Sequence, residues 1–171
     1  MSNALICTKP AVAVEIAPIE ARVAAKWWAD RLREGAKQQS TSQLQRQLAP
    51  WSTEKSDMAD VWKTITASHY RLNDEQLDDF EKHLATIVTM RYMRDEHWNR
   101  AKSDPNWGSA TRVLAVDYGP CDELRAAHQL AGGSKKGDCV FPIKTIMWIS
   151  PGSVTVQYGY GASVVQLMEQ S

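Results

Sequence analysis

The sequence predicts an α+β fold, in which a helical N-terminal half packs on a small, mainly antiparallel sheet of three to four strands with one further helix. Apolar residues between positions 19 and 92 recur at three- and four-residue spacing, the period of helices buried on one side. From residue 112 onward, short β-rich runs alternate with turn residues. We expect one compact domain that joins a helical region at 1–104 to a β-α-β-β-β region at 105–171.

The first predicted helix begins at Pro18 and ends at Gly35. Proline suits the first helical position because its missing amide hydrogen would be unsatisfied there in any case, and glycine commonly ends a helix. Residues 1–17 alternate in the manner of an extended arm or edge strand. The segment 36–57 is rich in Gln and Ser, and we interpret it as a mobile polar linker with room for a short helix around Leu44 and Leu48.

Two more helices are predicted in the N-terminal half. Ser56 suits the N-cap of a helix that runs to about Arg71. Asn73 followed by Gln76 has the spacing of a capping box, in which each side chain binds the backbone amide of the other residue. A third helix therefore begins after Asn73. Basic residues collect towards its C-terminal end, where they favour the helix dipole, and Pro105 ends the segment.

The C-terminal half contains the strands. The β-rich runs lie at 112–116, 144–149, 154–158 and 163–168. Pro120 opens a helix that the glycine pair at 132–133 ends. Pro151 and Gly152 lie at the centre of a four-residue link between two of the runs, which predicts a β-hairpin.

Composition excludes several classes of protein. The chain has 20 Lys and Arg against 20 Asp and Glu, so its net charge of zero argues against a nucleic-acid binder. Its longest apolar stretches fall well short of the roughly 20 residues that span a membrane. The N-terminus lacks the pattern of a secretory signal, so we expect a cytoplasmic protein. Its three cysteines lack paired spacing and fit reduced thiols.

No motif indicates an enzyme. Cys7, Cys121, Cys139 and His128 lack the tight ligand pairs of a structural zinc site. The glycine- and lysine-rich segment 132–137 has the wrong order for a phosphate-binding P-loop. We therefore expect no catalytic residue, no metal and no cofactor.

The unusual feature of the composition is its seven tryptophans, which outnumber five tyrosines and two phenylalanines. Periodicity places Trp62, Trp148 and one of the adjacent pair Trp27 and Trp28 in the core. Other aromatic and amphipathic residues lie in contexts that do not require burial and are typical of interfaces. The candidate binding residues are Trp51, Trp98, Trp107, Tyr118, Lys144, Tyr158 and Tyr160. If the loop and linker tryptophans prove exposed and clustered, the protein is a binder; if they are buried, they only fill the core.

Strand alternation divides the hairpin between two faces. One face has Thr145, Met147 and Ile149, and the other has Lys144, Ile146 and Trp148. Because both are largely apolar, the N-terminal helices must cover one of them. The other is either covered by the helix from Pro120 or left as a contact surface.

Stretches near both ends of the chain have familiar sequences. They are residues 24–30 (AAKWWAD), the turn 117–120 (DYGP), and the segment from Phe141 to Ser150 with 159–162 (GYGA). Together they resemble a group of small, uncharacterised proteins of bacteriophages and prophages. The resemblance covers the two ends and leaves the linker and the middle helices unmatched. It implies a phage or mobile-element accessory protein that binds and disables host machinery.

Our first hypothesis is accordingly a non-enzymatic accessory protein whose partner is a host protein or protein complex. Such a protein would inhibit a host defence complex, as anti-CRISPR proteins do, in the cytoplasm of the host cell. One alternative is a small enzyme or ligand-binding protein that uses Asp117, Tyr118, Lys144 and Tyr160 around the sheet. Another is a virion or assembly component that forms a homo-oligomer.

Overall fold

The computed structural model describes residues 17–47, 71–94, 96–104, 106–135, 140–142, 144–159 and 161–169. The helices in these ranges are α1 (Ile19–Gln47), α3 (Asp74–Tyr92), α4 (Glu96–Ser103) and α5 (Asp122–Leu130), with a short 3₁₀ turn, η1 (Ser109–Thr111). The strands are β1 (Val113–Val116), β2 (Thr145–Ser150), β3 (Ser153–Tyr158) and β4 (Val164–Glu169). The predicted α+β class, with a helical first half and an antiparallel sheet, is confirmed.

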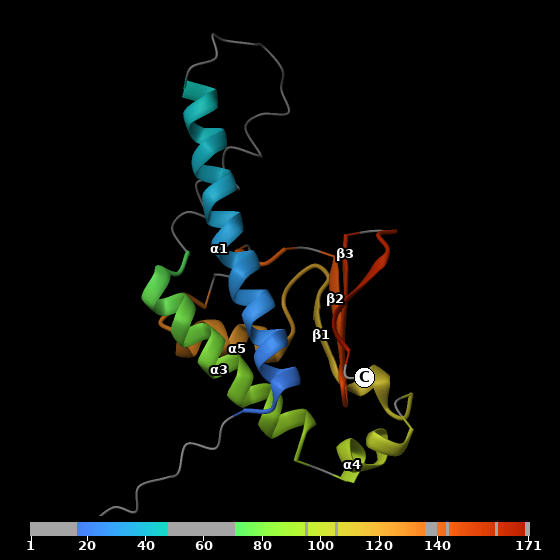
Figure 1. Cartoon of the computed structure of the whole chain (residues 1–171). Helices are drawn as coiled ribbons and strands as arrows, with labels where there is room; N and C mark the ends of the chain where they lie inside the picture. The colour runs from blue at the N-terminus through green and yellow to red at the C-terminus, as the bar shows by residue number, and fades with distance from the viewer. Residues whose placement is uncertain are drawn as a thin grey trace, which may run out of the picture.

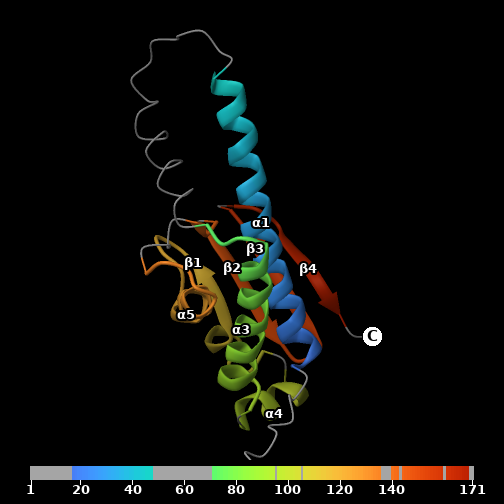
Figure 2. The ribbon, with the colours of Figure 1, turned by 90° about the vertical axis from the view of Figure 1, so that its left-hand side faces the viewer.

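The four strands form one antiparallel sheet in the order β1-β2-β3-β4. The helices α1, α3 and α5 all lie on the same side of it, as Figures 1 and 2 show from two directions. The Pro151-Gly152 turn joins β2 to β3 as predicted, and Gly152 adopts a φ of +74° that only glycine accepts readily. The sheet therefore has a helix-covered face and an opposite face.

The core fills the space between the sheet and the three helices. Its largest fully buried apolar side chains are Trp28, Phe80, Leu84, Val88, Leu114, Val116, Leu124, Met147, Ile149 and Val154. Complete burial of one such side chain stabilises a fold by about 1.5–3 kcal/mol. The ring of Phe141 lies 6.4 Å from that of Trp28 and 6.2 Å from that of Phe80, so the loop before β2 joins α1 and α3 in one cluster.

The capping box at the start of α3 is confirmed. The backbone amide of Gln76 donates to Asn73 Oδ1 over 2.8 Å, and the backbone amide of Asn73 donates to Gln76 Oε1 over 3.0 Å. Two amides at the helix N-terminus thus find partners within the helix itself.

Two predicted helix ends are wrong. α1 continues through Gly35 to Gln47, so residues 36–47 of the expected linker are helical. One glycine in a helix costs only about 1 kcal/mol relative to alanine, and the residues that follow include good helix formers. The expected single helix after Asn73 is divided, because α3 ends at Tyr92 and α4 begins at Glu96.

Other predictions fall on residues that are not described. The arm at 1–16, the remainder of the linker at 48–57 and the helix predicted from Ser56 as far as residue 70 all lie outside the described ranges. Within the ranges that are described, no helix combines the length and the hydropathy needed to cross a membrane.

Candidate functional site

The face of the sheet that points away from the helices carries apolar side chains. Burial alternates along β1, β2 and β3, and the residues that alternate out of the core are Val113, Ala115, Ile146, Trp148, Ser150, Ser153, Thr155 and Gln157. We call this set the open sheet face. The strand register pairs Val113 with Trp148 and Ala115 with Ile146, which places the four apolar residues side by side.

Little in the described part of the chain covers the open sheet face. In Figure 1 the helices α1, α3 and α5 lie on one side of the strands, and only the α4–η1 segment approaches the lower end of the sheet. Trp148 is half-buried and Ile146 is 36% exposed. The prediction that Trp148 belongs to the core is therefore wrong, because the helices cover the face formed by its neighbours Met147 and Ile149.

A cluster of polar side chains lies at one end of this face. The Lys144 ammonium pairs with the Asp117 carboxylate and lies 3.9 Å from the centroid of the Tyr118 ring. Lys144 has a φ of +58°, a left-handed conformation that non-glycine residues seldom adopt. Beside the cluster is a hollow of about 200 Å³, lined in part by Ile146 and Gln157. Asp117 and Lys144 therefore form part of the wall of the hollow, whereas Tyr118 does not line it.

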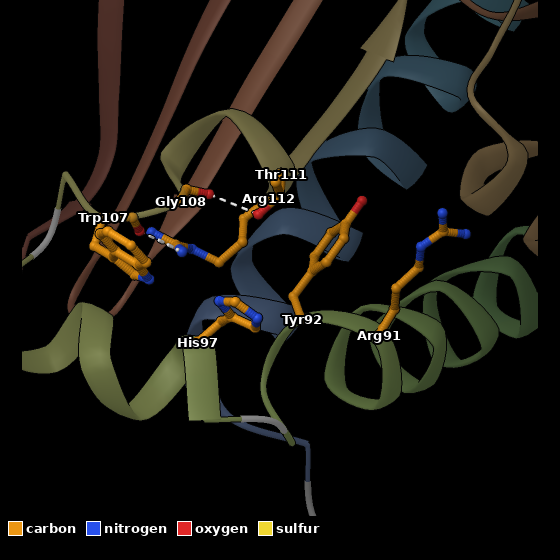
Figure 3. Close-up of a pocket in the computed structure, with 7 residues that line it drawn as sticks. All are labelled: Arg91, Tyr92, His97, Trp107, Gly108, Thr111 and Arg112. Atoms are coloured by element: carbon orange, nitrogen blue, oxygen red, sulfur yellow. Dashed lines mark hydrogen bonds between the residues drawn. The ribbon is translucent and has the colours of Figure 1, made fainter.

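A larger cavity lies at the lower end of the fold, where α3, α4 and η1 meet (Figure 3). Its volume is about 530 Å³. The lining residues are Arg91 and Tyr92 from α3, His97 from α4, and Trp107, Gly108, Thr111 and Arg112 from the segment that leads into β1. We call this cavity the basic pocket, because its described lining includes two arginines and a histidine but no Asp or Glu.

Arg112 is held in a fixed orientation behind the basic pocket. Only 2% of it is exposed. Its Nη1 donates to the carbonyl of Trp107 over 2.8 Å, and its Nε donates to the carbonyl of Ile149 over 3.1 Å. The guanidinium also lies 5.9 Å from the centroid of the Trp98 ring. A charge fixed by these contacts contributes to the potential in the cavity without large side-chain motion.

A hydrogen-bonded group closes the other side of the basic pocket. The Tyr92 hydroxyl donates to Glu123 Oε1 over 2.9 Å, and Arg91 Nε lies 2.9 Å from the same oxygen. Glu123 is buried, whereas the Arg91 side chain is 60% exposed. Burial, followed by the contact with Glu123, raises the pKa of the Tyr92 phenol. Tyr92 therefore stays protonated and acts as a hydrogen-bond donor.

The candidate binding residues from the sequence do not form one site. Trp98 is buried although periodicity does not place it in the core, whereas Trp107 is 37% exposed and lines the basic pocket. Tyr118 and Lys144 lie together at one end of the open sheet face. Tyr158 is on the helix side of the sheet, with its ring centroid 6.3 Å from that of Trp27.

The remaining candidates, Trp51 and Tyr160, lie outside the described residues, as do Trp62, Cys7 and Cys139. Cys121, the N-cap of α5, makes no side-chain capping bond, and burial raises the pKa of its thiol. A raised pKa lowers the thiolate fraction and argues against a reactive nucleophile.

Residues that sequence reasoning did not select include Arg91, His97 and Arg112 of the basic pocket. Of the three, only Arg91 belongs to the basic group predicted near the end of a helix, whereas Arg112 lies in a β-rich run. The three come from separate elements that the fold brings together. Strand alternation correctly predicts that Ile146 and Trp148 share one strand face. No local pattern of residues indicates that α5 packs on the same side as α1 and α3.

Comparison with known proteins identifies relatives of the whole C-terminal two-thirds of the chain. A family model described as the BTG family matches residues 54–168. Among solved structures, the chain is similar to a variant of the BTG/Tob domain of C. elegans FOG-3, with 13% sequence identity and a TM-score of 0.47. That similarity covers 63% of this chain and 77% of that chain. Comparison with curated proteins gave no match.

The family match corrects the functional expectations. The resemblance to phage and prophage proteins is wrong, and so is the hypothesis of an accessory protein that inhibits a host defence complex. That resemblance rested on short stretches at both ends of the chain, whereas the family match runs continuously through the middle helices and the sheet. The expectation of a protein partner holds in its general form, since BTG/Tob domains interact with other proteins.

Proposed function

The chain belongs to the BTG family, and from this we propose that it is a regulatory protein-binding module whose partner protein docks on the open sheet face. The observation that carries the proposal is the row of Val113, Ala115, Ile146 and Trp148 on a face that α1, α3 and α5 do not cover. The solvent-facing side of an antiparallel sheet normally alternates to polar residues. An apolar row in that position is typical of a surface that another protein covers.

The composition of the face supports a protein as the partner. Trp148 is a large amphipathic side chain of the type that contributes most to protein interfaces. Around it, Thr155 and Gln157 supply neutral hydrogen-bonding groups, and the main charged pair, Lys144 with Asp117, lies at one end. An apolar centre with a polar rim is the usual anatomy of a specific interface. We infer a partner surface with an apolar side chain that enters the hollow beside Ile146.

A photo-crosslinking experiment tests this assignment. A photoreactive amino acid in place of Gln157 lies within the open sheet face, and one in place of Met90, which is 59% exposed on α3, serves as the matched control. We expect one protein to be captured at position 157 and not at position 90. Equal capture at both positions, or capture at neither, would contradict the proposed surface.

The captured protein is then purified and titrated against variants of this chain. Ile146→Asp is expected to weaken binding by about tenfold or more, because it places a charge at the centre of an apolar contact. Met90→Asp makes the same change on the helical side and is expected to leave affinity unchanged. An Ile146→Asp variant that folds and binds like the original chain would rule out this face as the docking surface.

A further inference from the structure

The basic pocket is separate from the open sheet face and has the dimensions of a small-ligand site. Its volume of about 530 Å³ falls within the range of pockets that enclose small molecules. Figure 3 shows Trp107, His97, Tyr92 and Arg112 around one space, with Arg91 beyond Tyr92. The proposed docking of a protein on the sheet uses none of these side chains.

Several hydrogen-bond donors at the basic pocket make no side-chain hydrogen bond to the described chain. The indole N–H of Trp107 and the imidazole of His97 are two of them, and both residues are exposed. Arg91 makes one contact, through Nε to Glu123, which leaves its terminal nitrogens without a partner in the described ranges. A pocket with donors and no acidic lining residue matches a ligand rich in acceptors.

The charges around the basic pocket favour an anion. Arg112 is buried behind it, and the guanidinium of Arg100 lies 3.7 Å from the centroid of the Trp107 ring. Stacking on an aromatic ring holds a guanidinium in place while its N–H groups stay available. Glu123, on the far side of Tyr92, is already bound by the Tyr92 hydroxyl and by Arg91. The described lining of the basic pocket thus has basic side chains and no carboxylate.

We propose that the basic pocket binds a phosphate monoester whose molecule also carries a flat aromatic ring. The phosphate oxygens would accept hydrogen bonds from His97 and from the Trp107 indole in the field of Arg112, since charged acceptors form the strongest such bonds. The ring would pack against the aromatic walls formed by Tyr92 and Trp107. A free nucleoside monophosphate, in which ribose joins the phosphate to the base, and a phosphotyrosine side chain, in which the phosphate is bonded to the ring through oxygen, both combine these two groups. The experiment distinguishes them.

Titrations followed by NMR test the proposal on the full chain labelled with ¹⁵N. The indole N–H signal of Trp107, assigned from its absence in Trp107→Phe, reports directly on the basic pocket. The probes are 5′-AMP, N-acetyl-phosphotyrosine amide, adenosine and inorganic phosphate. We expect the Trp107 signal to move and saturate with at least one of the two ring phosphates. Adenosine and inorganic phosphate should each bind at least about tenfold more weakly, because each lacks half of the contacts.

The response to each ring phosphate identifies the source of the ligand. Saturation with 5′-AMP alone assigns a free nucleotide, saturation with the phosphotyrosine amide alone assigns a phosphorylated protein, and saturation with both assigns the shared chemistry. A Trp107 signal that none of the probes moves would overturn the proposal. Inorganic phosphate that binds as tightly as either ring phosphate would also overturn it.

A pair of histidine variants provides the matched control. His97→Ala is expected to weaken binding of the ring phosphate by about tenfold, through loss of a donor to a charged group. His83→Ala makes the same change on α3, roughly two helical turns before the pocket, and should bind like the original chain. Equal weakening in both would contradict the assignment. Ile146→Asp should leave phosphate binding intact, so the outcome is independent of the proposed protein interface.

Discussion

The Tyr92 hydroxyl donates a hydrogen bond of 2.9 Å to the buried carboxylate of Glu123 and thereby joins α3 to α5. A buried carboxylate is unfavourable unless hydrogen bonds and an opposite charge compensate for the lost water. Here the hydroxyl supplies one such bond, and Arg91 supplies both the charge and a second contact. This arrangement fixes the ends of two helices at the wall of the basic pocket.

Tyr92→Phe removes the hydroxyl and keeps the ring. We expect the free energy of unfolding to fall by about 1.5–3 kcal/mol, because a buried charged acceptor loses a donor. Urea denaturation at neutral pH measures the change. Tyr118→Phe is the control: Tyr118 is 91% exposed, and its substitution should alter stability by less than about 0.5 kcal/mol. Equal stability of the two variants would show that the hydroxyl is not part of the network.

The raised pKa of the Tyr92 hydroxyl predicts that the free energy of unfolding depends on pH in the alkaline range. Burial and the contact with Glu123 raise the pKa of Tyr92 above its ordinary value of 10.0 in the folded chain. The unfolded chain therefore releases this proton first as the pH rises. The stability that Tyr92 contributes is present below about pH 10 and is lost progressively above it.

Urea denaturation between about pH 9 and pH 11 tests this dependence. The free energy of unfolding of the original chain should decrease above pH 10 by up to about 1.4 kcal/mol per pH unit from this group alone. Tyr92→Phe should lack that component, whereas Tyr118→Phe should retain it. Parallel profiles for all three proteins would contradict the prediction.

Elements with local signals could be predicted from the sequence. The start of α3 depends on Asn73 and Gln76, which lie three residues apart, and the β2–β3 hairpin depends on Pro151 and Gly152 between two β-rich runs. The length of α1 could not be predicted in this way, because a single glycine disfavours a helix by less than a run of helix-forming neighbours stabilises it.

The candidate sites depend on packing between distant segments. Trp98 and Trp107 are close in sequence, yet Trp98 is buried and Trp107 lines the basic pocket. Strand alternation separated Trp148 from Met147 but gave no information about which side the helices cover. Which face of the sheet is covered depends on how α1, α3 and α5 pack together. No local sequence pattern indicates that packing.

Substitution by alanine should have opposite effects on stability at two glycines, Gly35 within α1 and Gly133 after α5. A Cβ at Gly133 would lie 2.2 Å from ring atoms of His128 and 2.6 Å from the His128 carbonyl oxygen, whereas a Cβ at Gly35 meets nothing within 4 Å. Gly133→Ala should therefore destabilise the fold by about 1–3 kcal/mol through overpacking. Gly35→Ala should stabilise it by about 0.5–1 kcal/mol, because alanine loses less backbone entropy in a helix.

Thermal unfolding of the two glycine variants measures these changes side by side. A lower Tm for Gly133→Ala and a higher Tm for Gly35→Ala are the expected results. A neutral Gly133→Ala would mean that the loop after α5 moves freely enough to accept the methyl group. A destabilising Gly35→Ala would show that α1 does not continue as a helix through this position.

The two tryptophans of the α4 region should differ strongly in their contributions to stability. Trp98 is 6% exposed and packs with the core, so Trp98→Ala leaves a cavity and should lower the free energy of unfolding by about 3–5 kcal/mol. Trp107 is 37% exposed and stacks with Arg100, so Trp107→Ala should lower it by about 1 kcal/mol or less. Urea denaturation of both variants gives the comparison. A cost at Trp107 as large as that at Trp98 would mean that Trp107 contributes to the fold as much as a core side chain does, which contradicts its position as a half-exposed wall of the basic pocket.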